Sequence, residues 1–305
     1  IIFYTISVKG IRKSGLLRII FAPVLILRSI FQSIFVIYRV NPEVVIGMGG
    51  YVSGPVGVAA KLCGRKLVIH EQNAIAGLTN KLLCLVANRT LQAFPDTFKR
   101  SVKAKTTGNP VRSSISSLPP VEMRRKDESR LSVLIFGGSR GASILNDVVP
   151  RAIMISRLQD LSILHQCGEG NESVTLQGYS ELNPSCSVTV VNYVEEMADA
   201  YRVADLVIAR SGAVTVSELA AVGIASILVP YANAVDDHQM KNAHYLVGAG
   251  AALLIAEQDL SAENVSNNIK SLVLSNERLL RMGKAARELG FKDSLSLFVD
   301  NCIRF

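Results

Sequence analysis

Metal-binding patterns of cysteine and histidine are missing from this sequence. The five cysteines include no C-x-x-C pair, and the four histidines are equally dispersed along the chain. This spacing argues against a zinc site and against a disulfide scaffold, and it favours reduced thiols in a cytosolic setting. We therefore expect no bound metal ion.

Motifs of several other protein classes are missing as well. No G-x-G-x-x-G is followed by an acidic residue about 20 positions later, and no G-K-[ST] marks a P-loop. A nicotinamide cofactor is therefore not favoured, and we expect no cofactor. Basic residues are not gathered into a stripe with interleaved aromatic residues, so a nucleic-acid partner is the least favoured class.

The chain starts at Ile1 without the layout of a secretory signal, and we expect a further N-terminal segment to precede it.

The composition is that of a folded protein with room for two domains. Hydrophobic residues make up 49% and charged residues 19% of the 305 residues, which argues against disorder. The net charge of +8 suits an anionic partner. Nucleic acid, a phospholipid surface and a diphosphate substrate all fit that description, and charge alone does not choose among them.

Apolar runs of strand length alternate with amphipathic helical stretches nearly throughout. Strands are expected at 44–47, 66–70 and 89–94, and helices at about 15–39, 53–62, 75–87, 262–275 and 277–289. This alternation predicts an α/β protein with two Rossmann-like domains that face a cleft at the carboxyl ends of their parallel strands. The expected boundaries are a first domain at 1–112, a linker rich in Ser, Pro and charge at 113–130, a second domain at 131–290, and a C-terminal helix at 291–305 that can pack back on the first domain.

Residues 16–40 form the most apolar segment of the chain. The longest uninterrupted apolar run, Ile19 to Leu27, is too short to span a bilayer. Arg18, Arg28 and Arg39 lie among Ile, Leu and Phe, a pattern that suits a helix lying in the lipid headgroup region. The alternative is a core-facing helix whose arginines point to solvent. The two interpretations are nearly even, and the positive net charge slightly favours membrane contact.

The stretch 204–242 carries the strongest functional signal. It reads as a buried strand, a turn of small residues, a short helix, a second strand and a polar loop. Thr215, Ser217 and Glu218 fall at the start of the helix, where backbone N–H groups and the helix dipole favour an anion. Glu218 can accept hydrogen bonds from ribose hydroxyls, and the loop Asp236–Gln239 can reach a sugar beyond a diphosphate. The alternative is that Thr215 and Glu218 form a capping box.

Two glycine-rich turns add to this signal. GMGGYVSGP (47–55) and GGSRGAS (137–143) each follow a strand and precede a helix, which is the context of phosphate-binding loops. Tight strand-to-helix turns require glycine in any α/β protein, so neither turn is specific by itself.

Polar residues follow the strand at 66–70. In HEQNAIAGLTN (70–80), His70 or Glu71 could act as a general base, and Asn73 could hold a substrate amide or hydroxyl. Asn73 could instead cap the next helix. Arg112, in GNPVR, could bond or stack on a base or phosphate, although a solvated linker arginine is the commoner case.

Together these motifs closely resemble one family. GMGGYVSGP, HEQNAIAGLTN, GNPVR, GGSRGAS, RSGAVTVSE and DDHQ occur in its order across essentially the whole chain. The family is that of the bacterial undecaprenyldiphospho-muramoylpentapeptide β-N-acetylglucosaminyltransferases, in glycosyltransferase family 28. The resemblance implies a fold of the GT-B type. It also implies inverting, metal-independent transfer of N-acetylglucosamine (GlcNAc) from UDP-GlcNAc to the C4 hydroxyl of lipid I, giving lipid II and UDP. The enzyme would be peripheral on the cytoplasmic face of the plasma membrane, against anionic lipids.

The resemblance also implies a set of binding residues. Ser139 would hold the diphosphate, the backbone at Val194 would meet the uracil, Glu218 would take the ribose hydroxyls, and Gln239 would take the hydroxyls of the sugar. The acceptor-side loop, expected to meet the lipid diphosphate, contains Gly49, Gly50, Tyr51 and Ser53. The family's donor contacts fall on Asn73, Arg112, Ser139, Val194, Ala213, Val214, Thr215, Val216, Ser217, Glu218 and Gln239.

One family motif does not occur in this sequence. The G-G-T-G-G-H loop, which contains the histidine favoured as the family's catalytic residue, is absent from the chain. We therefore expect the catalytic base in the N-terminal segment that precedes Ile1, with His70 and Glu71 as weaker candidates. Two alternatives stay open: a remnant that binds UDP-GlcNAc without transferring it, and a UDP-GlcNAc epimerase of the same architecture.

Overall fold

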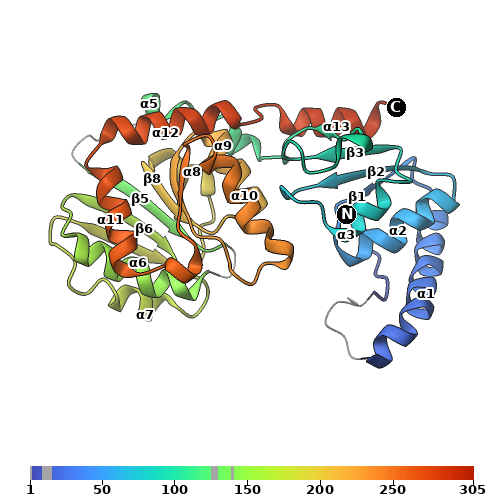
Figure 1. Ribbon diagram of the computed structural model, residues 1–305, viewed down its shortest axis with the longest axis horizontal. Coiled ribbons are helices and arrows are strands. Elements are labelled where there is room, and N and C mark those ends of the chain that lie inside the picture. The colour runs from blue at the N-terminus through green and yellow to red at the C-terminus, as the bar shows by residue number, and fades with distance from the viewer. Residues whose placement is uncertain (1, 9–15, 125–129, 139–140) are drawn as a thin grey trace. The chain divides into compact units, whose positions relative to one another are not determined.

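The computed structural model describes residues 2–8, 16–124, 130–138 and 141–305 (Figure 1). The chain divides into two compact units. The first unit comprises Ile1–Asn109 and Ser294–Phe305, and the second comprises Pro110–Asp293. Each unit is an α/β fold around its own parallel sheet, so the predicted fold class is confirmed.

The first unit has a four-stranded sheet in the order β1-β2-β3-β4, with every pair parallel. Strand β2 is buried from Leu67 to Glu71, as expected for a central strand of a parallel sheet. The core of the unit collects around Leu67, Ile69, Leu83 and Phe98. Its elements are α1 (Leu16–Val40), β1 (Val44–Gly47), α2 (Gly50–Leu62), β2 (Lys66–Glu71), α3 (Leu78–Leu83), β3 (Arg89–Gln92), η1 (Arg100–Val102), β4 (Lys105–Thr106) and α13 (Ser294–Ile303).

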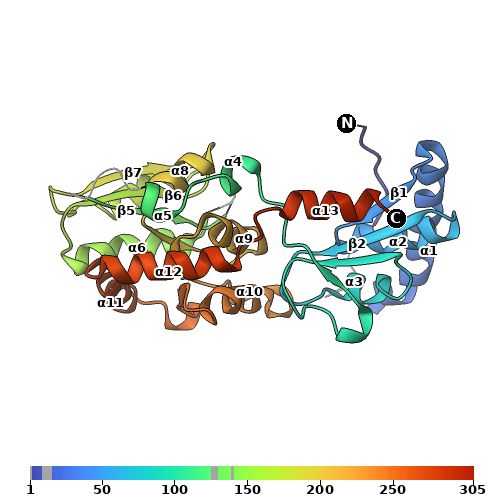
Figure 2. The ribbon, with the colours of Figure 1, turned by 90° about the horizontal axis from the view of Figure 1, so that it is seen from above.

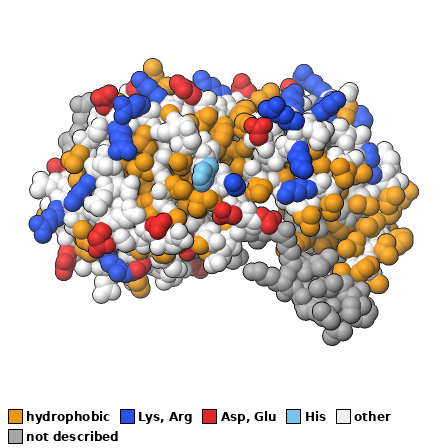
Figure 3. Space-filling view, in the orientation of Figure 1, with side chains coloured by type: hydrophobic (Ala, Val, Ile, Leu, Met, Phe, Trp, Pro, Cys, Tyr) orange, Lys and Arg blue, Asp and Glu red, His pale blue; other side chains and the backbone are white. Residues whose placement is uncertain are grey.

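Helix α1 buries a narrow, partly polar stripe and exposes an apolar one. Ala22, Ser29, Ser33 and Ile37 are buried at helical spacing, and α1 lies against α2. On the other side, the large side chains of Val24, Leu27, Phe31, Phe35 and Tyr38 are exposed. Hydrophobic side chains gather over this part of the first unit in the space-filling view (Figure 3).

By length and composition, residues Ala22–Val40 of α1 could cross a membrane. The sequence predicts a segment too short to span a bilayer, because the uninterrupted apolar run ends at Leu27, before Arg28. The helix continues through this arginine, so counting uninterrupted residues underestimated its apolar length.

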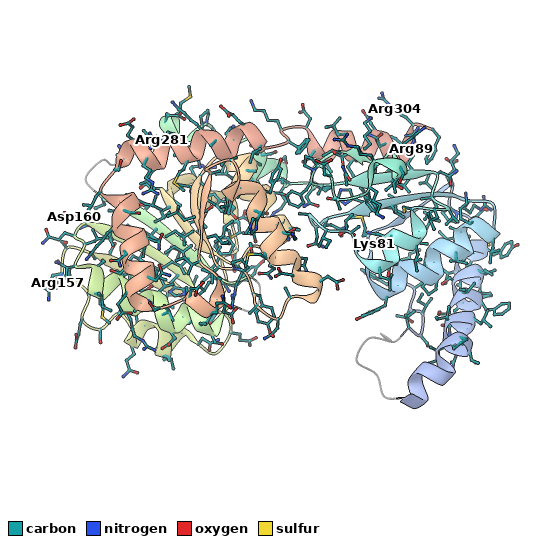
Figure 4. All side chains as sticks on the ribbon, viewed as in Figure 1. Lys81, Arg89, Arg157, Asp160, Arg281 and Arg304 are labelled. Atoms are coloured by element: carbon teal, nitrogen blue, oxygen red, sulfur yellow. The ribbon has the colours of Figure 1, made fainter. Side chains whose placement is uncertain are left out.

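The C-terminal helix α13 is held on the first unit by side chains of the sheet. Nη1 of Arg89 on β3 donates to the carbonyl oxygen of Asn301 at 3.0 Å, and its guanidinium lies 4.5 Å from the ring centroid of Phe305 (Figure 4). The ring of Phe298 meets His70 edge-on at 5.2 Å. The last residues of the chain therefore complete the first unit.

The second unit has a six-stranded parallel sheet in the order β10-β9-β8-β5-β6-β7. The chain runs outward from β5 in one direction and from β8 in the other, so the order reverses between these two neighbours. In open α/β sheets, ligands bind beyond the carboxyl ends of the strands at such a reversal. The strands are β5 (Leu131–Phe136), β6 (Leu161–Gln166), β7 (Ser187–Val191), β8 (Leu206–Ala209), β9 (Ala225–Leu228) and β10 (Ala252–Leu254).

Helices of the second unit pack in pairs. Helix α6 lies beside α11, and α9 beside α12 (Figures 1 and 2). The expected helices at 262–275 and 277–289 are confirmed as α11 and α12. The helical elements are α4 (Ser113–Ser116), α5 (Val121–Arg124), α6 (Ser143–Ser156), α7 (Glu172–Gln177), α8 (Met197–Val203), α9 (Ala213–Val222), η2 (Val235–Asp237), α10 (His238–Val247), η3 (Glu257–Asp259), α11 (Ala262–Val273) and α12 (Asn276–Leu289).

Two local expectations need correction. The helix expected at 75–87 is only the six-residue α3, because the residues before it form a loop whose Gly77 N–H donates to the Glu71 carboxylate. The helix expected at 53–62 begins earlier, at Gly50, because Gly49 and Gly50 adopt positive φ angles of 81° and 75° and turn the chain directly into α2.

Candidate active site

The loops after β5 and β8 lie at the reversal of strand order in the second unit. The loop after β8 leads through Arg210, Ser211 and Gly212 into α9. Gly212 is the N-cap residue of α9 and has no side chain, so a ligand can approach the first turn of this helix closely. Residues 213–218, predicted from the motif, form the first turns of α9.

Glu218 is the acidic group of this site. Its side chain is only 10% exposed and lies 3.9 Å from Nη2 of Arg112, measured to Oε1. The hydroxyl of Tyr201 on α8 donates to Oε2 at 3.1 Å. Burial raises the pKa of Glu218, while the Tyr201 hydrogen bond and the Arg112 charge act in the opposite direction.

The capping-box alternative for Glu218 is wrong. Thr215 lies inside α9 rather than at its N-cap, which is Gly212, and the Glu218 carboxylate pairs with Tyr201 instead of a backbone N–H at the helix start. The structure thus brings Glu218 and Arg112 together from motifs about 100 positions apart in the sequence.

Gln239 is held in position by hydrogen bonds to its side chain and to its backbone. Its Oε1 accepts a hydrogen bond from the backbone N–H of Tyr231 at 2.9 Å, and its carbonyl oxygen accepts one from Ser211 Oγ at 2.8 Å. The side-chain amide of Asn242 donates to the Ser211 carbonyl at 3.2 Å. The start of α10 is therefore tied to the turn that precedes α9.

An ion pair that the sequence did not predict supports the same loop. Nη1 of Arg210 lies 2.5 Å from Oε2 of Glu257 and donates to the carbonyl oxygens of Val229 and Pro230. Arg210 stands inside the RSGAVTVSE motif and could have been singled out there. Glu257 is 47 residues away and no local pattern marks it.

Close packing requires glycine at two positions of the loop after β5. A Cβ atom on Gly137 would overlap Ala142, and one on Gly141, where φ is +70°, would overlap the carbonyl oxygen of Cys167. These glycines therefore have a structural requirement in addition to any role in binding. Ser139 lies outside the described residues. Val194 is half-buried between β7 and α8.

In the first unit, the Glu71 carboxylate holds the HEQN loop. Oε1 accepts from the backbone N–H and the side-chain amide of Asn73 at 3.1 and 3.2 Å. Oε2 accepts from Gly77 N–H at 3.0 Å and from the Asn80 side chain at 2.9 Å. Asn73 does not cap α3, whose N-cap residue is Gly77, so that alternative is wrong.

His70 is fully buried beside this loop. Its Nε2 lies 3.1 Å from the carbonyl oxygen of Gly108, and burial lowers its pKa. In this arrangement His70 and Glu71 brace the backbone, and the catalytic role that the sequence suggests for them stays a prediction.

The expected acceptor-side loop lies at the N-terminus of α2. Ser53 Oγ donates to the carbonyl oxygen of Gly49 at 2.5 Å, and Tyr51 is exposed. A Cβ on Gly49 would lie 3.3 Å from the side-chain nitrogen of Asn80. Within the described part of the chain, no cluster of three or more His, Cys, Asp or Glu side chains could hold a metal ion.

Comparisons with known proteins identify the family. Residues 1–92 match the glycosyltransferase family 28 N-terminal domain, and residues 132–298 match its C-terminal domain. The UDP-N-acetylglucosamine–N-acetylmuramyl-(pentapeptide) pyrophosphoryl-undecaprenol N-acetylglucosamine transferase of Shewanella piezotolerans is 46% identical over 300 residues, covering 98% of this chain and 82% of the relative. The enzyme of the same name from Shewanella frigidimarina is 45% identical over 302 residues, with the same coverage.

Solved structures agree with this assignment. The crystal structure of Acinetobacter baumannii MurG matches with a TM-score of 0.87 and 34% identity, covering 99% of this chain and 85% of that one. A UDP-GlcNAc 2-epimerase from Neisseria meningitidis, bound to UDP-GlcNAc, matches with a TM-score of 0.65 but only 13% identity, covering 96% and 82%. That second likeness shows the fold alone.

The resemblance seen in the six motifs is thereby confirmed, together with the GT-B type of fold. Both family domains are matched, and the similarity to the Shewanella enzymes runs over nearly all of this chain. The chain belongs to glycosyltransferase family 28, in the group of the undecaprenol-linked N-acetylglucosamine transferases.

Proposed function

We propose that this protein transfers GlcNAc from UDP-GlcNAc to lipid I, giving lipid II and UDP. The observation that carries the proposal is the 46% identity, over 98% of the chain, to a transferase of that name. In the reaction, the C4 hydroxyl of the acceptor attacks C1 of GlcNAc, and UDP leaves with inversion at that carbon. The resulting charge on UDP needs compensation, which the start of α9 and nearby backbone amides can supply.

The proposed donor site lies in the second unit. The order reversal between β5 and β8, the glycine N-cap of α9 and the buried Glu218 beside Arg112 support it. Glu218 accepts the two ribose hydroxyls, and Gln239 bonds the hydroxyls of GlcNAc. Backbone groups at Val194 meet the uracil, and Ser139 meets the diphosphate.

The proposed division of labour follows the expected domains. Residues 131–290 bind UDP-GlcNAc, and residues 1–112 bind the acceptor, with Gly49, Gly50, Tyr51 and Ser53 at the lipid diphosphate. The positive φ angles of the two glycines and the start of α2 next to them support an anion at this loop.

Peripheral binding to the cytoplasmic face of the plasma membrane is part of the proposal. The exposed apolar face of α1 supports it, since large exposed apolar patches mark interaction surfaces. Arg28 and Arg39 on the same helix and the net charge of +8 favour anionic lipids.

Calorimetric titration with UDP-GlcNAc tests the donor site. The unchanged protein is expected to bind, and Glu218→Ala is expected to lose at least about tenfold in affinity, because the ribose hydroxyls lose a charged acceptor. The control is Glu181→Ala, which removes an exposed glutamate of the same unit. If Glu218→Ala binds as tightly as the control, Glu218 does not contact the donor. Binding without any transfer to lipid I would instead support the binding-only alternative.

A further inference from the structure

Tyr201 on α8 is the partner of Glu218 that no motif marks. Its side chain is completely buried, and its hydroxyl donates to Oε2 of Glu218 at 3.1 Å. The ring packs edge-on against Phe136 of β5, with ring centroids 6.2 Å apart. Because the ring is enclosed, packing fixes the position of the hydroxyl group.

Arg124 holds the two helices that carry this pair. Its guanidinium is buried, with Nη1 donating to the carbonyl oxygen of Tyr201 at 3.0 Å and Nη2 donating to that of Val222 at 2.8 Å. Tyr201 lies in α8, and Val222 is the last residue of α9. The spacing of the Tyr201 hydroxyl and the Glu218 carboxylate is therefore set by the scaffold.

The hydrogen bond from Tyr201 holds the Glu218 carboxylate in one orientation and leaves it able to accept further hydrogen bonds. An ionised carboxylate has about four lone-pair sites, and Tyr201 occupies one of them on Oε2. Arg112 lies 3.9 Å from the other oxygen, Oε1. A carboxylate that is fixed in this way can accept from two neighbouring hydroxyl groups without first losing rotational freedom.

We infer that Tyr201 is a positioning residue that gives this protein its preference for ribose over 2′-deoxyribose nucleotides, by fixing the Glu218 carboxylate for two adjacent hydroxyl donors. The inference rests on the proposed contact between Glu218 and the ribose. A buried group built to bond a hydroxyl rejects an analogue that lacks this hydroxyl, because the group is then left unpaired.

Nucleotide discrimination by Tyr201→Phe tests the inference. Affinities for UDP and 2′-deoxy-UDP are measured by calorimetry on the full chain. Tyr201→Phe is expected to weaken UDP about tenfold and to change 2′-deoxy-UDP much less, so that the ratio of the two affinities falls. Tyr179→Phe is the matched control, because Tyr179 is also buried in the second unit but its hydroxyl pairs with Nδ1 of His165, at 2.9 Å. The control is expected to keep the ratio of the unchanged protein.

The pH dependence of UDP binding separates positioning from a general loss of packing. The titrating groups that act on Glu218 are Tyr201 from α8 and Arg112 ahead of α4. Burial raises the pKa of Glu218, and the hydrogen bond from Tyr201 opposes this rise. Without the hydroxyl, the carboxylate protonates at higher pH. The pH at which UDP affinity is half lost is therefore expected to be higher in Tyr201→Phe than in the unchanged protein.

Two results would overturn the inference and are distinguishable from each other. If Glu218→Ala abolishes the preference for UDP while Tyr201→Phe keeps both the ratio and the pH midpoint, Tyr201 only fills space. If Glu218→Ala keeps the preference, Glu218 does not read the ribose, and the proposed donor contact fails together with the role of Tyr201.

Discussion

At the scale of single residues, buried polar side chains organise both units. Glu71 in the first unit and His165 in the second are each almost inaccessible to solvent and each bond groups from different elements. Leaving a buried polar group without its hydrogen-bond partner costs more free energy than forming that hydrogen bond contributes to stability. Substitutions at these residues should therefore affect stability strongly.

Glu71→Ala is expected to lower the free energy of unfolding by about 3 kcal/mol, since four hydrogen-bond donors around the HEQN loop lose their acceptor. Urea denaturation gives the value. Glu43→Ala, which removes an exposed glutamate of the first unit, is the control and should stay within about 0.5 kcal/mol of the unchanged protein. Equal losses in the two variants would show that the loop does not depend on Glu71.

His165 should make stability depend on pH. Burial lowers its pKa from the ordinary 6.5 to about 4. The pKa is lower in the folded state, so the neutral ring favours folding above about pH 6.5, and this contribution is lost as the pH falls toward 4. Between pH 7 and pH 5 the expected loss is about 2 kcal/mol. Denaturation at both pH values should show that His165→Gln loses less over this interval. The exposed His244→Gln should behave like the unchanged protein, and a pH effect that is equal in both variants would exclude His165 as its source.

The sequence could predict site residues only where a motif contained them. Glu218 was recognisable because it follows a strand, a small turn and a helix start. Tyr201 and Glu257, which hold Glu218 and Arg210, lie in other elements and carry no local pattern. Contacts between residues distant in the sequence depend on strand order, which a single sequence does not give.

At the scale of elements, apolar runs predicted the strands well, whereas helix ends were decided by particular contacts. Strand β1 has the bounds expected from VVIG, and β2 extends only one residue further. The shortened α3 depends on hydrogen bonds to Glu71, and the early start of α2 depends on two residues with positive φ. Neither feature has a hydrophobic period that a sequence pattern could detect.

Gly223 ends α9, and its replacement should destabilise the second unit. Its φ is +69°, and a Cβ atom there would lie 2.8 Å from the Arg287 side chain. Gly223→Ala is expected to cost about 3 kcal/mol, from backbone strain and crowding together. Gly250→Ala is the matched control, with φ of +71° and nothing within 4 Å of the added Cβ, and should cost about 1 kcal/mol. The difference between the two denaturation midpoints measures the crowding, and equal midpoints would refute it.

The exposed face of α1 should bind lipid. Replacing Phe31 and Phe35 together by Glu is expected to weaken binding to vesicles containing phosphatidylglycerol by more than about tenfold, because apolar area is lost and negative charge is added. Vesicle sedimentation measures this. Leu274→Glu changes an exposed leucine of the second unit and should have little effect. Equal binding by the two variants would place the lipid contact elsewhere.

At the scale of the whole molecule, the same parallel α/β plan occurs twice in one chain. The alternation of strands and helices predicted this plan from the sequence, and the two sheets confirm it. Function could not be predicted from the plan, because an epimerase and a transferase both share it. The motifs in the loops, and the 46% identity to a curated transferase, distinguish the two.

Formation of lipid II by this chain is the most direct test of the account. The protein would be incubated with UDP-GlcNAc, labelled in the sugar, and with lipid I in detergent, and the lipid products would be separated. The account predicts labelled lipid II and one UDP released for each sugar transferred, with a large loss of rate in Glu218→Ala. Folded protein that binds UDP-GlcNAc but forms no lipid II, with lipid I in excess, would contradict it.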